Sequence, residues 1–145
     1  MEQVLKVKAF LDTNILLDIL VQGRNDALSS AVILDSAMLK KVELFTCIQS
    51  YLDISYILRK ANGQKKLFSL LEWMLNHTNV EYPDRFDIWE AMESGGKDFE
   101  DEVLIAHANS SACDYFITSD RELLQKEIPG MRFLTPESFV SLMQE

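Results

Sequence analysis

Apolar and polar positions alternate along the chain in short blocks, and these blocks predict strands and helices in turn. Residues 4–11 predict a strand, because β-branched and aromatic residues surround two lysines and the last three residues are all apolar. A continuous apolar end is typical of a strand that is buried on both faces of a sheet. Similar short runs predict four further strands, over residues 42–47, 79–82, 115–118 and 132–134.

The segments between the strands place apolar residues at helical spacing. Residues 48–60 are one example, and we expect Leu52, Tyr56 and Leu58 to point largely inward. The other predicted helices cover residues 15–20, 27–39, 64–76, 86–93, 99–111, 121–126 and 136–143. Strands that alternate with helices predict an α/β fold with a parallel sheet. Right-handed crossovers then place helices on both faces, which gives three α/β/α layers.

Length and composition fit one soluble globular domain over residues 1–145. The chain is 48% hydrophobic and 26% charged, without repeats or linker-like tracts. No apolar run approaches the roughly 18 residues that span a bilayer, so we expect no membrane segment. The apolar N-terminal stretch also lacks the features of a signal peptide. Cys47 and Cys113 lie in apolar surroundings without a CxxC pair, which indicates buried, reduced thiols in a cytoplasmic protein.

The net charge of −9 argues against general affinity for nucleic acids, because phosphate binding normally comes from Lys and Arg. Two features could offset this argument. Some acids could be concentrated at a metal site, and the basic residues are partly grouped as Lys40-Lys41, Arg59-Lys60 and Lys65-Lys66. Such short clusters more often mark a solvated helix face than a nucleic-acid groove.

Two predicted strands run into an acid. Asp12 follows residues 4–11 directly, and Asp120 follows residues 115–118 after one serine. Ligands of open parallel sheets sit at the carboxyl ends of strands, near the point where strand order reverses. If these two strands are neighbours, both acids face one crevice. Further candidates are Asp98 and Asp101, where the helix over residues 99–111 begins, and Asp53 in the helix over residues 48–60.

Each of these acids also has a purely structural explanation. Asp12 could be a loop acid or the N-cap of the helix over residues 15–20, and Asp120 could cap the helix over residues 121–126. Asp98 is a strong helix N-cap candidate, with Asp101 in a capping-box-like position where the helix dipole favours a carboxylate. Asp53 could lie on a solvent-facing stripe.

Taken together, the acids indicate a specific chemistry. Converging carboxylates repel and raise one another's pKa values, and a divalent cation removes that cost. Oxygen ligands suit Mg²⁺ or Mn²⁺, which can promote phosphodiester hydrolysis. His77 and His107 lack zinc-ligand spacing, and packing explains His107 better than ligation. The sequence contains no Gly-rich phosphate loop and no serine-nucleophile elbow.

Three segments resemble the motifs of PIN domains, in the same order and over essentially the whole chain. Residues 10–18 (FLDTNILLD) closely resemble the first motif of that family. Residues 98–108 (DFEDEVLIAHA) are similar to its third, acidic motif, and residues 112–120 (ACDYFITSD) to its fourth, a strand followed by an acid. Each motif alone is weak, but the ordered set strongly resembles a VapC-like toxin ribonuclease.

The resemblance implies a sheet order of 3-2-1-4-5 and Mg²⁺- or Mn²⁺-dependent cleavage of RNA. By motif, Asp12, Asp101 and Asp120 would be metal ligands or would orient the attacking water. Asn14 would support the first acid through hydrogen bonds, and Thr118 would do the same near the fourth. Asp101 is preferred to Asp98 as the inward acid. In many bacterial relatives, the enzyme is the toxin of a toxin–antitoxin pair and forms homodimers.

One departure from the family pattern leaves a second function open. The second motif usually carries Glu where this chain has Asp53, whose shorter side chain would reach a metal through water or mark a decayed site. The alternative is therefore a weak or inactive PIN-fold module that binds RNA or protein. A phosphotransferase of the haloacid-dehalogenase type is disfavoured, because that pattern needs a second Asp where this chain has Asn14.

Overall fold

The computed structural model describes residues 6–20, 33, 35, 41–59 and 64–144, and its centre is a five-stranded parallel sheet. The strands are β1 (Val7–Leu11), β2 (Val42–Cys47), β3 (Asn79–Glu81), β4 (Tyr115–Ile117) and β5 (Arg132–Leu134). Their order is β3-β2-β1-β4-β5, and every pairing is parallel. This topology confirms the predicted α/β fold and makes the first and fourth strands neighbours.

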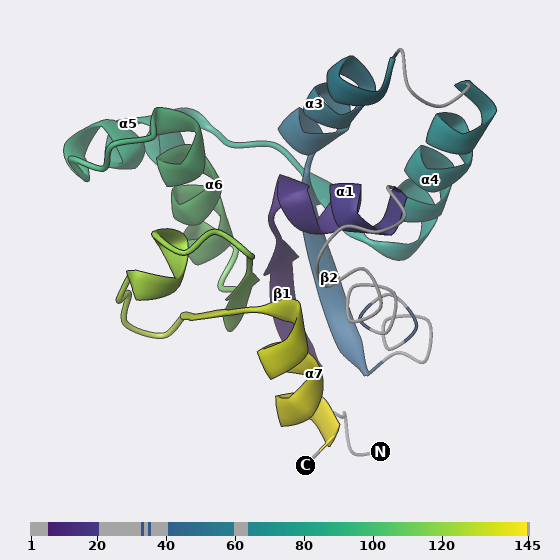
Figure 1. The fold of residues 1–145 in the computed structure, drawn as a ribbon. Helices are drawn as coiled ribbons and strands as arrows, with labels where there is room; N and C mark the ends of the chain where they lie inside the picture. The colour runs from purple at the N-terminus through teal and green to yellow at the C-terminus, as the bar shows by residue number, and fades with distance from the viewer. Residues whose placement is uncertain (1–5, 21–32, 34, 36–40, 60–63, 145) are drawn as a thin grey trace, which may run out of the picture.

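Helices cover both faces of the sheet, as Figure 1 shows. They are α1 (Thr13–Leu20), α3 (Ile48–Leu58), α4 (Gln64–His77), α5 (Arg85–Glu93), α6 (Phe99–Ser110) and α7 (Pro136–Gln144). Successive residues of a strand point to opposite faces, so β1 serves two cores. Ala9 and Leu11 pack in the cluster that includes residues of α3, α4 and α7, whereas Phe10 packs in the cluster that includes residues of α6.

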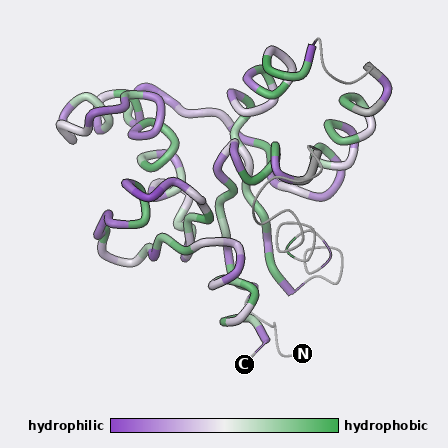
Figure 2. The backbone as a smooth tube through the Cα atoms, in the orientation of Figure 1, coloured by the Kyte–Doolittle hydropathy of each residue, from purple (hydrophilic) through white to green (hydrophobic). Residues whose placement is uncertain are grey.

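Aromatic packing fixes the α6 side of the sheet. Phe116 of β4 is fully buried, and its ring lies 5.2 Å from the rings of both Phe10 and Phe133. The strands at the centre are mostly hydrophobic in Figure 2, whereas the outer helices alternate between hydrophobic and hydrophilic residues. Cys47 and Cys113 are buried and unpaired, as predicted. None of the helices in the described ranges has the length and apolar character needed to cross a membrane.

Two local predictions are wrong. Residues 121–126 do not form an α-helix but contain the short 3-10 turn η1 (Leu123–Gln125). A carboxylate oxygen of Asp120 accepts hydrogen bonds from the backbone N–H groups of Glu122 and Leu123, which closes a tight turn at this point. A six-residue segment is also too short to sustain a helix by itself.

The inward face of α3 was also assigned incorrectly. Leu52 and Tyr56 are 62% and 68% exposed, whereas Tyr51, Ile54 and Leu58 are buried. The buried residues follow the i, i+3, i+7 spacing of one helical face, so only Leu58 of the predicted set lies on it. Of the helix predicted over residues 27–39, only residues 33 and 35 are described, and Ile33 is buried.

Candidate active site

The paired ends of β1 and β4 bring Asp12 and Thr118 together. Leu11 pairs with Ile117, so the two residues that follow them lie side by side. Asp12 is only 4% exposed, and its Oδ2 accepts a hydrogen bond of 2.8 Å from the Thr118 hydroxyl. Its Oδ1 accepts a second one, also 2.8 Å long, from the backbone N–H of Thr13. The Asp12 carboxylate is therefore fixed in orientation at the switch point of the sheet.

Thr118 also connects Asp12 to the loop that carries Asp120. The backbone N–H of Asp120 donates to the Thr118 hydroxyl oxygen over 3.1 Å. Because that hydroxyl donates to Asp12 at the same time, one side chain aligns both strand ends. Asp120 is partly buried, and its Oδ1 accepts from the backbone N–H groups of Glu122 and Leu123, so it closes the turn that leads into η1 instead of capping the predicted helix.

Asp98 and Asp101 mark the start of α6. Asp98 is the N-cap residue, and its Oδ1 accepts a hydrogen bond of 3.2 Å from the backbone N–H of Asp101. The predicted cap is thus confirmed. Asp101 lies in the first turn of the helix, is partly buried and lines the same cleft as Asp12.

Burial and neighbouring acids raise the pKa of the central carboxyls. Burial raises the pKa of Asp101 to about 7, with repulsion from Asp98, Asp12 and Asp120 adding to the shift. Burial also raises the pKa of Asp12, although the hydrogen bonds from Thr118 and Thr13 oppose the shift. These four acids therefore act on one another across the strand ends, and a bound cation would relieve their repulsion.

A cleft of about 440 Å³ opens at the carboxyl ends of the strands. Asp12 and Asp101 line it together with Asp53 of α3, and Asn14 lines it with an exposed side chain. Asp53 accepts a hydrogen bond of 3.2 Å from the Gln49 side chain, so its carboxylate belongs to the α3 wall of the cleft. The Asp12 carboxylate is held by Thr13 and Thr118. The supporting role of Asn14 stays a prediction.

The structure adds residues that the motifs did not indicate. The hydroxyl groups of Thr13 and Ser50 lie 2.7 Å apart and join the start of α1 to the first turn of α3. Gln49, Ile57 and Phe99 contribute to the cleft lining. A polar residue directly after Asp12, and others opening the helix that carries Asp53, were the signals that could have suggested these contacts.

The donor set fits a hard divalent cation by its chemistry. Asp12, Asp101 and Asp120 offer carboxylate oxygens, which are the ligands that Mg²⁺ and Mn²⁺ prefer. In the part of the chain that the structure describes, no three His, Cys, Asp or Glu side chains are grouped closely enough to hold an ion as they stand. The fit therefore concerns the type of donor atom and its position at the ends of β1 and β4 and the start of α6, and the ligand geometry itself is not formed.

The raised pKa of Asp101 predicts that the metal-free protein becomes less stable as pH rises. The folded-state pKa of about 7 exceeds the ordinary value of 3.8, so the folded protein binds more protons across that interval. Because Asp101 is only partly buried, we expect a loss of about 1–2 kcal/mol in unfolding free energy between about pH 4 and pH 7. Urea unfolding in EDTA measures it. The Asp101→Asn variant should show a flatter profile, and an equally steep one would contradict this account.

Comparison with known proteins agrees with this fold. A family model described as the PIN domain matches residues 8–122. No curated protein sequence is similar enough to count as a match. Among solved structures, the sarcin–ricin-loop-cleaving toxin VapC20 of Mycobacterium tuberculosis has a TM-score of 0.64 at 15% identity, covering 79% of this chain and 91% of its own.

Two further structures are similar over nearly their whole length. VapBC2 from Rickettsia felis, bound to a promoter DNA fragment, has a TM-score of 0.65 at 14% identity and covers 88% of this chain and 97% of its own. PAE2754 from Pyrobaculum aerophilum has a TM-score of 0.64 at 19% identity, covering 95% and 90%. These identities establish likeness of fold. With the family match over residues 8–122 and the sheet order found above, the chain belongs to the PIN-domain family.

Proposed function

We propose that the protein is a metal-dependent endoribonuclease that hydrolyses RNA phosphodiester bonds and acts in the cytoplasm as the toxin of a toxin–antitoxin pair. The observation that carries the proposal is the pairing of β1 with β4, which places Asp12, Thr118 and the Asp120 loop in one hydrogen-bonded group. Asp101 belongs to the same electrostatic cluster. The similarity in fold to VapC20, a sarcin–ricin-loop-cleaving toxin, supports the substrate class.

Each acid has a distinct role in this proposal. Asp12, Asp101 and Asp120 would hold Mg²⁺ or Mn²⁺, which when bound would activate water and neutralise charge that develops on the phosphoryl group. Thr118 orients Asp12 and fixes the backbone at Asp120. Asp98 keeps the first turn of α6 in place, so that Asp101 faces the cleft. Asp53 would orient water from the opposite wall, beside Asn14.

The lining of the cleft supports binding of single-stranded RNA despite the net charge of −9. Its walls contain apolar side chains such as Ile57 and Phe99 beside the acids. Phe99 is 51% exposed, so its ring is accessible to a base. Stacking of bases on aromatic rings contributes affinity without phosphate contacts, which suits a protein whose overall charge repels phosphate. A bound cation would remove part of that repulsion at the cleft itself.

We also propose that protein partners cover the outer faces of α3 and α5. Leu52 and Tyr56 on α3, and Phe86, Trp89 and Met92 on α5, are all more than half exposed. Their spacing of three or four residues places them on one face of each helix, and grouped apolar side chains of this kind mark interaction surfaces. The partners would be a second copy of the chain and an antitoxin. The solved structure from Klebsiella pneumoniae with a similar fold is a toxin–antitoxin complex, which supports the antitoxin partner. Sedimentation velocity of the isolated protein separates a monomer from a dimer.

The activity is tested by removing and restoring the metal. We expect the purified protein to cleave RNA in Mn²⁺ or Mg²⁺, to lose cleavage in excess EDTA, and to regain it when Mn²⁺ is added back. Gel electrophoresis of an end-labelled RNA follows the reaction, and calorimetry measures Mn²⁺ binding.

The opposite result identifies the alternative function. A folded protein that neither binds Mn²⁺ nor cleaves RNA would be a binding module with the PIN fold. Cleavage that persists at full rate in EDTA would instead exclude the metal-dependent mechanism.

A further inference from the structure

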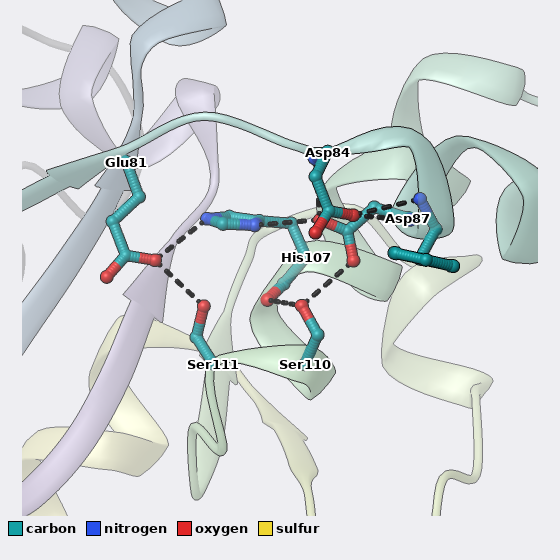
Figure 3. Close-up of polar contacts among 7 residues, drawn as sticks. Glu81, Asp84, Asp87, His107, Ser110 and Ser111 are labelled. Atoms are coloured by element: carbon teal, nitrogen blue, oxygen red, sulfur yellow. Dashed lines mark hydrogen bonds and ion pairs between the residues drawn. The ribbon is translucent and has the colours of Figure 1, made fainter.

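His107 is buried between two carboxylates and not among apolar side chains alone. It is 5% exposed on α6. Its Nδ1 lies 3.1 Å from Oδ2 of Asp87 on α5, and its Nε2 lies 3.1 Å from Oε2 of Glu81 at the end of β3. Figure 3 shows the ring between the two acids. Phe10 of β1 presents its ring to the histidine at 6.2 Å in an edge-to-face arrangement.

Each ring nitrogen of His107 faces one carboxylate. A ring nitrogen that carries a proton donates to an oxygen, whereas a bare lone pair at the same place would be repelled. The Nδ1 contact with Asp87 is a hydrogen bond, and Nε2 lies close to Glu81 without the alignment of one. Glu81 and Asp87 are the charged groups that the structure places against the ring.

Two serines complete the network. The Ser110 hydroxyl donates to Oδ1 of Asp87 over 2.8 Å, and the Ser111 hydroxyl donates to Oε2 of Glu81 over 2.9 Å. Glu81, Asp87, His107, Ser110 and Ser111 together form what we name the His107 clasp. The clasp joins the end of β3, the first turn of α5 and the C-terminal end of α6.

The opposite end of α6 carries the acid of the proposed active site. Asp101 precedes His107 by six residues, which is about 9 Å along a helix. A helix moves as a rigid rod over that length, so a clasp at its C-terminal end restrains its first turn. Phe10, which contacts the His107 ring, precedes Asp12 by two residues on β1. The clasp is thus connected to both walls that hold the acids.

We propose that His107 is a positioning residue, which sets the placement of Asp101 relative to Asp12 by clamping α6 to β3 and α5. This inference rests on the proposed function for its effect on activity. Removal of the ring leaves the carboxylates of Glu81 and Asp87 without the group that lies between them and loosens the clasp. The metal affinity of the cleft therefore depends on a residue that does not touch it.

The test compares His107→Gln with wild type in Mn²⁺ affinity, measured by calorimetry at pH 7. We expect Mn²⁺ to bind about 3- to 30-fold more weakly to the variant, the range found for mutations that alter coupling between distant sites. The control variant Ala106→Gly lowers the helix propensity of α6 without touching the clasp, and it should weaken Mn²⁺ binding less than His107→Gln does. Unchanged affinity in His107→Gln, or a loss no larger than that of Ala106→Gly, overturns the proposal.

Hydrogen exchange separates failure of the clasp from failure of the proposed function. At pH 6 and without metal, we expect the amides of residues 102–105 to lose protection in His107→Gln but not in Glu137→Gln, which alters an exposed acid on α7. Loss of protection supports the clasp even if wild type neither binds Mn²⁺ nor cleaves RNA. Unchanged protection overturns the clasp even if wild type is an active nuclease.

Discussion

Replacing Asp12 by Asn should reduce Mn²⁺-dependent RNA cleavage by about 100-fold or more, the usual loss when one central electrostatic group is removed from an active site. Asp12 is buried and held by two hydrogen bonds, so its carboxylate has one orientation and no nearby acid can replace it there. Gel assays of initial cleavage rates, at saturating Mn²⁺ and neutral pH, measure the loss.

The same substitution should leave the fold intact. Asn has the shape of Asp, its carbonyl oxygen can accept from Thr13, and its amide can donate to the Thr118 oxygen. Removal of a buried charge also avoids the penalty of desolvation, so we expect the unfolding free energy to stay within about 1 kcal/mol of wild type or to rise. Glu137→Gln is the control, and it should cleave at the wild-type rate. Unchanged cleavage by a folded Asp12→Asn protein would exclude Asp12 from the reaction.

Thr118→Val should weaken Mn²⁺ binding by about 10- to 100-fold, the range typical for losing a hydrogen-bond partner of a metal ligand. Valine has almost the same shape but lacks the hydroxyl that donates to Asp12 and accepts from the Asp120 backbone. Both strand ends lose their shared hydrogen-bond partner, and the pKa of Asp12 rises further because one opposing hydrogen bond is removed. Calorimetric titration with Mn²⁺ measures the affinity.

Thr118→Ser separates the hydroxyl from the packing of the methyl group. Serine retains the hydrogen-bonding oxygen, so Mn²⁺ affinity should stay close to that of wild type even if the protein becomes slightly less stable. Equal weakening in the Val and Ser variants would assign the effect to packing and would remove Thr118 from the proposed mechanism.

The acids were identifiable from the sequence to different degrees. Asp98 was correctly predicted as the N-cap of α6, because a cap depends on residues within one helical turn. Asp12 and Asp120 were recognisable as acids at strand ends, but whether they share a crevice depends on strand pairing. The resemblance to the PIN domain implied that pairing, and the structure confirms it. Asp53 lines the cleft, but its role in the reaction stays a prediction.

The sequence by itself determined the succession of strands and helices, because hydrophobic periodicity and caps arise from residues that are close along the chain. It could not determine which helix positions are buried when apolar residues surround the whole helix, and Leu52 and Tyr56 on α3 are exposed for this reason. It also indicated a helix over residues 121–126, where the Asp120 side chain closes a 3-10 turn instead.

Only the tertiary structure decided which side chains meet. Thr118 donates to Asp12 from 106 positions away, because β1 and β4 pair in a register that places Leu11 beside Ile117. His107 lies between Glu81 and Asp87 because three separate elements converge around it. Such contacts depend on packing between distant segments, which no local pattern specifies. The sequence therefore indicated the acids and the helices, and the fold brought Asp12, Asp53 and Asp101 to one cleft.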